Sequence, residues 1–181
     1  MLDFSKNYFE LFGMPVGFVV DTAELANRYR ELQRVVHPDR YANATDQERR
    51  LSMQGATRIN EAFQVLKDPI ARARYLLLLN GIDLDAEKDN TTDAAFLMEQ
   101  LELREELHNA RHRSDPYQAI AELMGHINGS IKRLTGQLAV QLESATPEQL
   151  EQARETVRKM QFLQKVRSQA EGLEAELDEA L

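Results

Sequence analysis

The tripeptide His37-Pro38-Asp39 brings together an imidazole, a ring that breaks helices and a carboxylate. Proline disfavours helical geometry at the residue before it, so a helix that reaches His37 ends there and presents the imidazole at its end. Asp39 can then orient the following turn through hydrogen bonds to its own backbone. The tripeptide also has a simpler interpretation, in which proline stops a helix and the histidine is incidental. The neighbouring residues have to decide between the two.

The segment before the tripeptide has the pattern of an amphipathic helix, and Asp21 or Thr22 can cap its N-terminus. At 100° per residue, its apolar side chains form one stripe: Leu25, Tyr29, Leu32 and Val36. Arg30, Arg34 and His37 lie together on roughly the opposite side. The sequence therefore predicts a core face and a separate basic face that ends in the imidazole.

Other side chains give little support to catalytic or metal chemistry. Glu105, His108 and His112 follow one another at one-turn spacing and could in principle bind a metal, but this spacing is common and no further ligand is evident. The chain has no cysteine, no glycine-rich phosphate loop and no serine in a nucleophile-elbow pattern. We therefore expect no catalytic residue, no metal and no cofactor, and we predict that the protein is not an enzyme.

The charge distribution limits the classes of partner. The 181-residue chain has a net charge of −8, and the charge is uneven. Residues 1–80 contain 11 Lys and Arg against 10 Asp and Glu, whereas residues 81–181 contain 11 against 20. Nucleic-acid binding needs a broad basic surface, so a discrete protein partner is favoured.

The distribution of hydrophobic residues indicates where in the cell the protein is expected. No apolar run approaches the roughly 18 residues of a membrane span, and the N-terminus lacks the layout of a signal peptide. We expect a soluble, cytoplasmic protein with no membrane partner.

Helix-start and helix-stop signals divide the first half of the chain. Residues 7–13 form a short apolar helix closed by Gly13. A helix over residues 47–67 can pack its apolar side on the helix that ends at His37. Asp68-Pro69 starts a fourth helix, which Asn80-Gly81 stops.

The second half follows an acidic, polar stretch over residues 82–92, which we interpret as a linker. Helices are expected over about residues 93–110, 116–143 and 147–178, and their short connections predict an up-down-up bundle. Three glycines in the middle helix either weaken it or permit close packing, and the sequence leaves both possibilities open: Gly125, Gly129 and Gly136.

The expected helix over residues 93–110 has more apolar residues than one helix face can hold. Phe96, Leu103 and Leu107 fall within about 40° of one another and can form a core stripe. A second apolar set points elsewhere: Ala94, Leu97, Met98 and Leu101. Either the helix is wedged between two layers that bury both sets, or the second set is an exposed patch.

An exposed patch here has the composition of a protein-binding surface, because charged residues would form its rim. These rim residues are Glu102, Arg104 and Glu105. In the last helix, Phe162 lies at the edge of an apolar stripe and could extend the patch.

Several of these segments resemble a known family. Four features resemble a J domain: Tyr8-Phe9-x-Leu11-Phe12-Gly13, the basic helix, His37-Pro38-Asp39, and Ile59-Asn60-Glu61-Ala62-Phe63. Two others are similar to the HscB family of iron–sulfur co-chaperones: Asp68-Pro69-x-x-Arg72-Ala73-x-Tyr75-Leu76-Leu77, and the stretch from Phe96 to Leu107. The resemblance covers nearly the whole chain.

The resemblance implies an adaptor in iron–sulfur cluster biogenesis. In that family the J domain stimulates ATP hydrolysis by a DnaK-type chaperone, HscA, and the C-terminal bundle holds the scaffold protein IscU. The matching chaperone-binding positions are His37, Pro38, Asp39, Arg30, Arg34 and Arg40. The matching scaffold-binding positions are Leu97, Met98, Leu101, Glu102, Glu105 and Phe162. Asn109 stands where the acidic rim of the family would continue.

Pattern and resemblance together predict an all-α protein in an L-shaped arrangement. A J domain would span residues 1–81 with an antiparallel helical hairpin, a linker residues 82–92, and a three-helix bundle residues 93–181. The alternative is a helical interaction or scaffold protein without chaperone activity, in which His37-Pro38-Asp39 is only a turn. Oligomeric state is left open, because an exposed apolar patch can also serve a dimer.

Overall fold

Helices make up all the regular secondary structure in the part of the chain that the computed structural model describes, which is residues 3, 5–37, 44–84 and 93–179. The all-α fold class is thereby confirmed. The chain divides into two compact units, Met1–Asn80 and Gly81–Leu181. Within the described residues, no helix combines the length and apolarity needed to cross a membrane. Most of the predicted linker, residues 85–92, lies outside the described residues.

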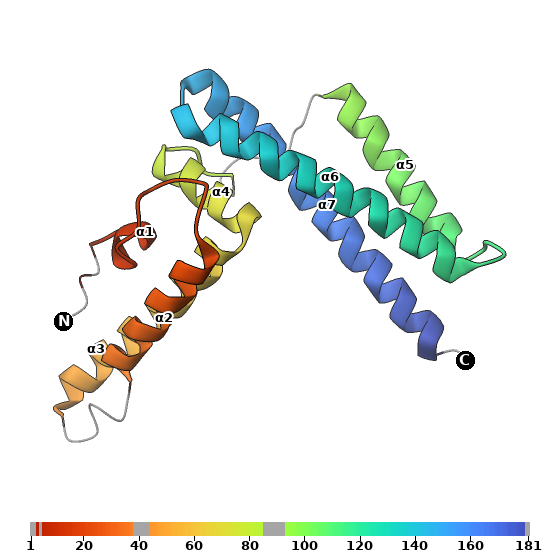
Figure 1. The fold of residues 1–181 in the computed structure, drawn as a ribbon. Helices are drawn as coiled ribbons and strands as arrows, with labels where there is room; N and C mark the ends of the chain where they lie inside the picture. The colour runs from red at the N-terminus through yellow and green to blue at the C-terminus, as the bar shows by residue number, and fades with distance from the viewer. Residues whose placement is uncertain (1–2, 4, 38–43, 85–92, 180–181) are drawn as a thin grey trace. The chain divides into compact units, whose positions relative to one another are not determined.

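The first unit contains four helices: α1 (Tyr8–Leu11), α2 (Thr22–Val36), α3 (Asp46–Lys67) and α4 (Pro69–Leu79). In Figure 1, α2 and α3 lie side by side as an antiparallel hairpin. The predicted α2 stripe is confirmed, because Leu25 and Val36 are buried and Tyr29 and Leu32 are partly buried. The interior of the first unit thus forms where the apolar faces of α2 and α3 meet.

Side-chain caps fix where these helices begin. Asp21 accepts hydrogen bonds from the backbone N–H groups of Ala23 and Glu24, and Asp68 accepts one from Ala71. Such caps satisfy N–H groups that have no partner within the helix. Gly13, just after α1, has φ +64°, a conformation that favours glycine because it has no Cβ.

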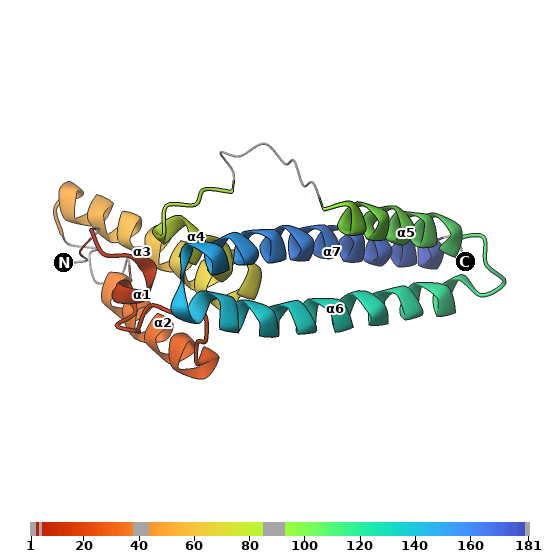
Figure 2. The same ribbon diagram turned by 90° about the horizontal axis from the view of Figure 1, so that it is seen from above.

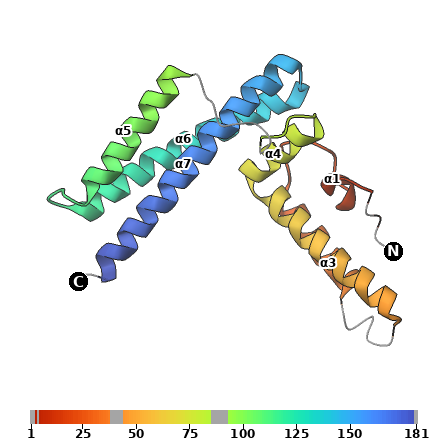
Figure 3. The same ribbon diagram turned by 180° about the vertical axis from the view of Figure 1, so that it is seen from behind.

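The short helix α1 is held by its contacts with α3 and α4, next to which it lies in Figure 3. Phe9 is fully buried, and the Tyr8 ring stacks on the Tyr75 ring at 4.4 Å between centroids. The Tyr8 backbone N–H also donates to the Tyr75 hydroxyl at 3.0 Å. Burial raises the pKa of Tyr8 to about 12. A single turn of helix is unstable by itself, so these contacts are what order it.

The second unit is the predicted up-down-up bundle of α5 (Ala94–Ala110), α6 (Pro116–Ser144) and α7 (Pro147–Glu179). Figure 2 shows α6 and α7 as a long antiparallel pair, with α5 lying along the C-terminal part of α7. Side chains from all three helices fill the interior: Phe96, Leu103, Ile120, Leu123, Ile127, Leu163, Val166 and Ala170. The bundle presents one outer surface of α5 to solvent.

The three glycines of α6 do not serve close packing. A Cβ atom built at Gly125, Gly129 or Gly136 would have no neighbouring atom within 4 Å, and all three residues are exposed or only partly buried. Of the two possibilities that the sequence left open, close packing is therefore excluded. These glycines leave α6 with less intrinsic helix stability than alanine would give it.

Candidate functional site

The backbone at the end of α2 holds His37 in place. The last helical residue is Val36, and His37 follows with φ −59° and ψ 131°, the extended geometry expected before a proline. The hydroxyl of Ser52 in α3 donates to the Val36 carbonyl at 2.7 Å, and Ser52 is only 6% exposed. The final carbonyls of a helix have no partner within the helix, so this bond satisfies one and ties the end of α2 to α3.

Contacts between α2 and α3 also fix the rotation of α2 about its axis. The rings of Tyr29 and Phe63 stack at 4.1 Å between centroids. The Tyr29 hydroxyl donates to Asn60 at 2.8 Å, and Gln33 donates to the same amide oxygen. With this side turned to α3, the opposite side of α2 faces solvent.

The predicted basic face lies on that solvent side. Arg30, Arg34 and His37 are all exposed, and Arg30 donates a hydrogen bond to Asn27 on the same helix. The other predicted chaperone-binding residues lie outside the described residues: Pro38, Asp39 and Arg40. The structure therefore places a cationic surface and an imidazole at the same end of α2.

On α5 the structure decides between the two alternatives for the apolar residues. Leu97, Met98 and Leu101 are 44%, 58% and 59% exposed, whereas Phe96 and Leu103 are each 3% exposed. The two-layer alternative is therefore wrong, and the second apolar set forms an exposed surface. Charged or polar residues around it are exposed as well: Glu102, Arg104, Glu105 and Asn109. We name Leu97, Met98, Leu101, Glu102 and Glu105 the α5 patch.

The N-terminus of α5 is fixed to α7 by charge. Asp93 caps α5 by accepting from the backbone N–H groups of Ala95 and Phe96, both at 3.1 Å. Its carboxylate also pairs with Lys159 of α7 at 2.8 Å, and the Lys159 ammonium lies 5.3 Å from the centroid of the Phe96 ring. The hydrogen bond from Lys159, followed by those from the backbone, lowers the pKa of Asp93. Periodicity gave no signal for Lys159, because a single lysine on a long helix does not reveal its partner.

Phe162 of α7 borders α5. Its ring is half-buried and meets the Phe96 ring edge-on, with 5.8 Å between centroids. The guanidinium carbon of Arg104 lies 5.5 Å from the centroid of the Phe162 ring. The structure thus brings an aromatic residue of α7 to the same side of the bundle as Arg104 of α5.

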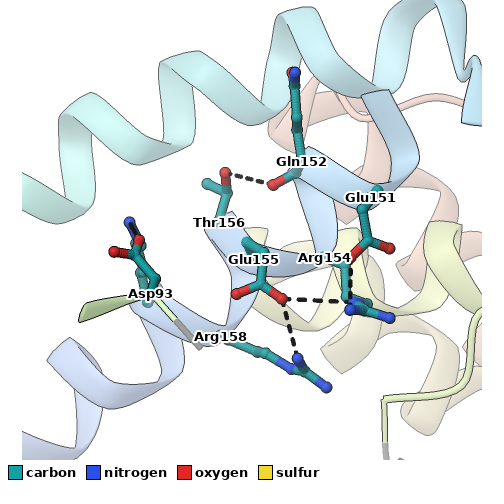
Figure 4. Close-up of polar contacts among 8 residues, drawn as sticks. Asp93, Glu151, Gln152, Arg154, Glu155, Thr156 and Arg158 are labelled. Atoms are coloured by element: carbon teal, nitrogen blue, oxygen red, sulfur yellow. Dashed lines mark hydrogen bonds and ion pairs between the residues drawn. The ribbon is translucent and has the colours of Figure 1, made fainter. Parts of the chain in front are cut away.

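Close to Asp93, α7 carries an ion-pair network (Figure 4). Glu155 pairs with Arg158 at 3.0 Å and with Arg154 at 3.6 Å, and Arg154 pairs with Glu151. Arg158 is 9% exposed, and a buried guanidinium is costly without a paired carboxylate. These ion pairs therefore have a structural role: they neutralise buried charge and stabilise α7.

The structure does not place Glu105, His108 and His112 as a metal site would require. His108 and His112 lie near each other, with 6.1 Å between ring centroids, but Glu105 does not line the groove that they share. Among the residues that the structure describes, no group of three His, Asp or Glu side chains is placed to hold a metal ion.

Family models match both halves of the chain. A model described as the DnaJ domain matches residues 7–75, and one described as the HSCB C-terminal oligomerisation domain matches residues 92–171. The chain is 44% identical over 168 residues to the co-chaperone protein HscB homolog of Shewanella amazonensis, covering 93% of this chain and 97% of that protein. It is 46% identical over 163 residues to the homolog of Shewanella halifaxensis, covering 90% and 94%.

Solved structures agree with these matches. Chaperone HscB from Vibrio cholerae is 38% identical with a TM-score of 0.84, covering 95% of this chain and 99% of that one. The human co-chaperone protein HscB is 30% identical with a TM-score of 0.86, covering 95% and 84%. Both units thus have the fold of known co-chaperones, and a J domain implies an Hsp70-type chaperone as partner. This chain therefore belongs to the HscB family of J-domain co-chaperones, which are not themselves enzymes.

Proposed function

We propose that this protein stimulates ATP hydrolysis by an HscA-type chaperone and brings to it an IscU-type scaffold protein of iron–sulfur cluster assembly. The two tasks would be divided between a J domain over residues 1–81 and a bundle over residues 93–181, joined by residues 82–92. The proposed setting is the bacterial cytoplasm, since curated relatives of this chain come from Shewanella, a bacterium.

For the chaperone, the proposed contacts are His37, Pro38, Asp39, Arg30, Arg34 and Arg40. The exposure of Arg30, Arg34 and His37 supports this assignment, because a cationic helix face complements an acidic surface on a partner. Stimulating a partner's ATPase requires contacts that differ between the partner's conformational states, and no proton transfer by His37 is needed.

For the scaffold, the proposed contacts are the α5 patch and Phe162. The observation that supports them most directly is the exposure of Leu97, Met98 and Leu101 on a helix that buries Phe96 and Leu103. A contiguous apolar surface with a charged rim is typical of protein-binding sites. Asn109 is exposed beside this surface. The acidic rim would therefore carry one negative charge fewer than the family resemblance implies.

The test is steady-state ATP hydrolysis by the cognate HscA-type chaperone, with and without the IscU-type scaffold. We expect His37→Gln to abolish stimulation while the protein still binds the scaffold. A triple change of Leu97, Met98 and Leu101 to alanine should keep the basal stimulation and lose only the additional effect of the scaffold.

Matched controls come from exposed residues of α6. His126→Gln repeats the histidine change, and Val140→Ala, at a position 63% exposed, removes another apolar side chain from the surface. Both should behave as wild type. If the wild-type protein gives no stimulation, the proposal is wrong and the chain is a helical interaction protein without chaperone activity.

A further inference from the structure

A groove of about 650 Å³ runs between the C-terminal parts of α5 and α7. From α5 and the turn after it, the groove is lined by Arg104, Leu107, His108, Arg111 and His112, and from α7 by Gln169, Gly172, Leu173 and Glu176. Leu173 is buried and Leu107 partly buried, so the apolar lining belongs to the bundle core while polar side chains form the walls. Apart from Arg104 and the His108–His112 pair, none of these residues has a role in the sites described above.

The walls of the groove carry two guanidinium groups and one carboxylate, a net positive charge, although residues 81–181 carry 20 Asp and Glu against 11 Lys and Arg. Two guanidinium groups and two imidazoles face one carboxylate, that of Glu176, which forms an ion pair with Arg111. Arg104 makes a cation–π contact with the Phe162 ring, and its guanidinium carries five N–H groups that can also donate hydrogen bonds to a carboxylate. The groove therefore fits carboxylates rather than cations.

The groove also continues the surface proposed for the scaffold. Arg104 lines the groove and at the same time contacts Phe162, and it lies one turn from Leu101 of the α5 patch. A partner that covers the α5 patch and Phe162 would thus reach the groove without leaving the seam between α5 and α7. The acidic rim of the patch and the cationic groove would then face different parts of one partner.

We infer that this groove is a second part of the scaffold-binding surface and takes an acidic segment of the scaffold protein. The inference rests on the proposed function. A surface with carboxylates at one end and guanidinium groups at the other fixes the direction in which a partner of matching charge can dock, because the reversed orientation would place like charges together.

Gly172 gives a test that leaves the interior untouched. A Cβ atom at Gly172 has no neighbour within 4 Å, so a longer side chain there can enter the groove without displacing the core. Three variants separate charge from size: Gly172→Glu, Gly172→Gln and Gly172→Lys. The matched control is Gly129→Glu on α6, which also replaces an exposed helical glycine and adds one negative charge.

The measurement is the Kd for the IscU-type scaffold by calorimetry, using the full-length protein at low and high salt. We expect Gly172→Glu to raise the Kd by about five- to tenfold at low salt, Gly172→Gln by less, and Gly172→Lys least. Gly129→Glu should bind as wild type. The difference between the Glu and Lys variants should shrink at high salt, because screening acts on exposed charges.

Equal effects of Glu and Lys at position 172, or none, would overturn the inference. So would a change in oligomeric state by light scattering with unaltered scaffold affinity, since the groove would then bind a second copy of this chain. The triple alanine variant of Leu97, Met98 and Leu101 distinguishes failure of the proposed function from failure of the groove assignment alone. If it still binds the scaffold, the proposed function fails, whereas if it loses binding and the Gly172 series has no effect, only the groove assignment fails.

Discussion

The position of His37 depends on the residue before it. Ser52 donates to the Val36 carbonyl from a buried position, so the last turn of α2 is anchored to α3 directly before His37. The Ser52 hydroxyl thus links two helices, whereas an exposed hydroxyl on α3 can bond within its own helix. Thr57, for example, donates to the Met53 carbonyl within α3 and is exposed.

Ser52→Ala should lower the free energy of unfolding by roughly 1–3 kcal/mol, because the Val36 carbonyl would stay buried without this donor. Urea denaturation followed by circular dichroism measures this. Thr57→Ala is the control and should change stability by about 0.5 kcal/mol or less. An equally small effect at Ser52 would show that the Val36 carbonyl finds another donor.

Asp93 should make stability depend on pH. Its pKa is lowered in the folded state, chiefly by Lys159, so its contribution is present above the unfolded value of about 3.9 and is lost as pH falls through the folded value. Asp93→Asn keeps a capping side chain and removes the charge. The variant should therefore be less stable than wild type at pH 7, and the difference should close below about pH 4.

Urea denaturation from pH 7 to pH 3 tests this prediction, with Lys159→Met as the partner change. In the Lys159→Met background the effect of Asp93→Asn should shrink, because the carboxylate has lost its cation. A stability difference between wild type and the Asp93→Asn variant that stays constant from pH 7 down to pH 3 would contradict the assignment.

At the scale of helices, α5 divides its apolar residues between two uses. Phe96 and Leu103 belong to the bundle interior, whereas Leu97, Met98 and Leu101 face solvent. Because α5 carries apolar residues on both its buried and its exposed sides, its hydrophobic pattern was ambiguous. It also means that the exposed set can be changed without disturbing the core.

Replacing Leu97, Met98 and Leu101 together by alanine should change the free energy of unfolding by less than about 1.5 kcal/mol, as is usual for surface positions. Leu103→Ala, a single change at a buried position of the same helix, should cost about 2–5 kcal/mol. Thermal unfolding of both variants gives the comparison. A triple variant as unstable as Leu103→Ala would mean that the patch is covered in the free protein.

Glycine substitutions should have opposite signs in two backbone contexts. Gly129→Ala in α6 should stabilise the protein by about 0.5–1 kcal/mol, because the site is exposed, helical and open around a Cβ. Gly13→Ala should destabilise it, because residue 13 has φ +64°. Chemical denaturation of the two variants measures both signs, and a loss of stability in Gly129→Ala would show that α6 needs glycine there.

At the scale of the whole molecule, an adaptor works by carrying both binding surfaces on one chain. Under the proposed function, tethering would raise the effective concentration of the scaffold at the chaperone, and two separate molecules would not reproduce this. The basic face of α2 and the α5 patch lie in different compact units, so each can be removed without touching the other.

A mixture of His37→Gln and the triple alanine variant should therefore not restore the effect of the scaffold on ATP hydrolysis. The first protein keeps the proposed scaffold surface and the second keeps the proposed chaperone surface, but no molecule has both. The control is an equal mixture of wild type with either variant, which should retain the effect of the scaffold. Full recovery by the mixed variants would show that linkage within one chain is unnecessary.

Much of the fold could be predicted from local signals. Asp68 caps α4 as expected and Pro69 occupies its first helical position, while Asp21, one of the two capping residues that the sequence offered, caps α2. The predicted stripe of α2 is buried at Leu25 and Val36 and partly buried at Tyr29 and Leu32. These features depend on residues within one or two turns of each other, which is why periodicity and capping rules are enough to find them.

By itself, the sequence determined the helices, their order and, through the resemblance, the family. Only the tertiary structure decided that Leu97, Met98 and Leu101 are exposed, that the α6 glycines pack against nothing, and that Ser52 and Lys159 hold the ends of α2 and α5. Periodicity gives the direction of a side chain around its own helix, but exposure and pairing depend on which other helix occupies that direction. That information lies in contacts between residues far apart in the chain.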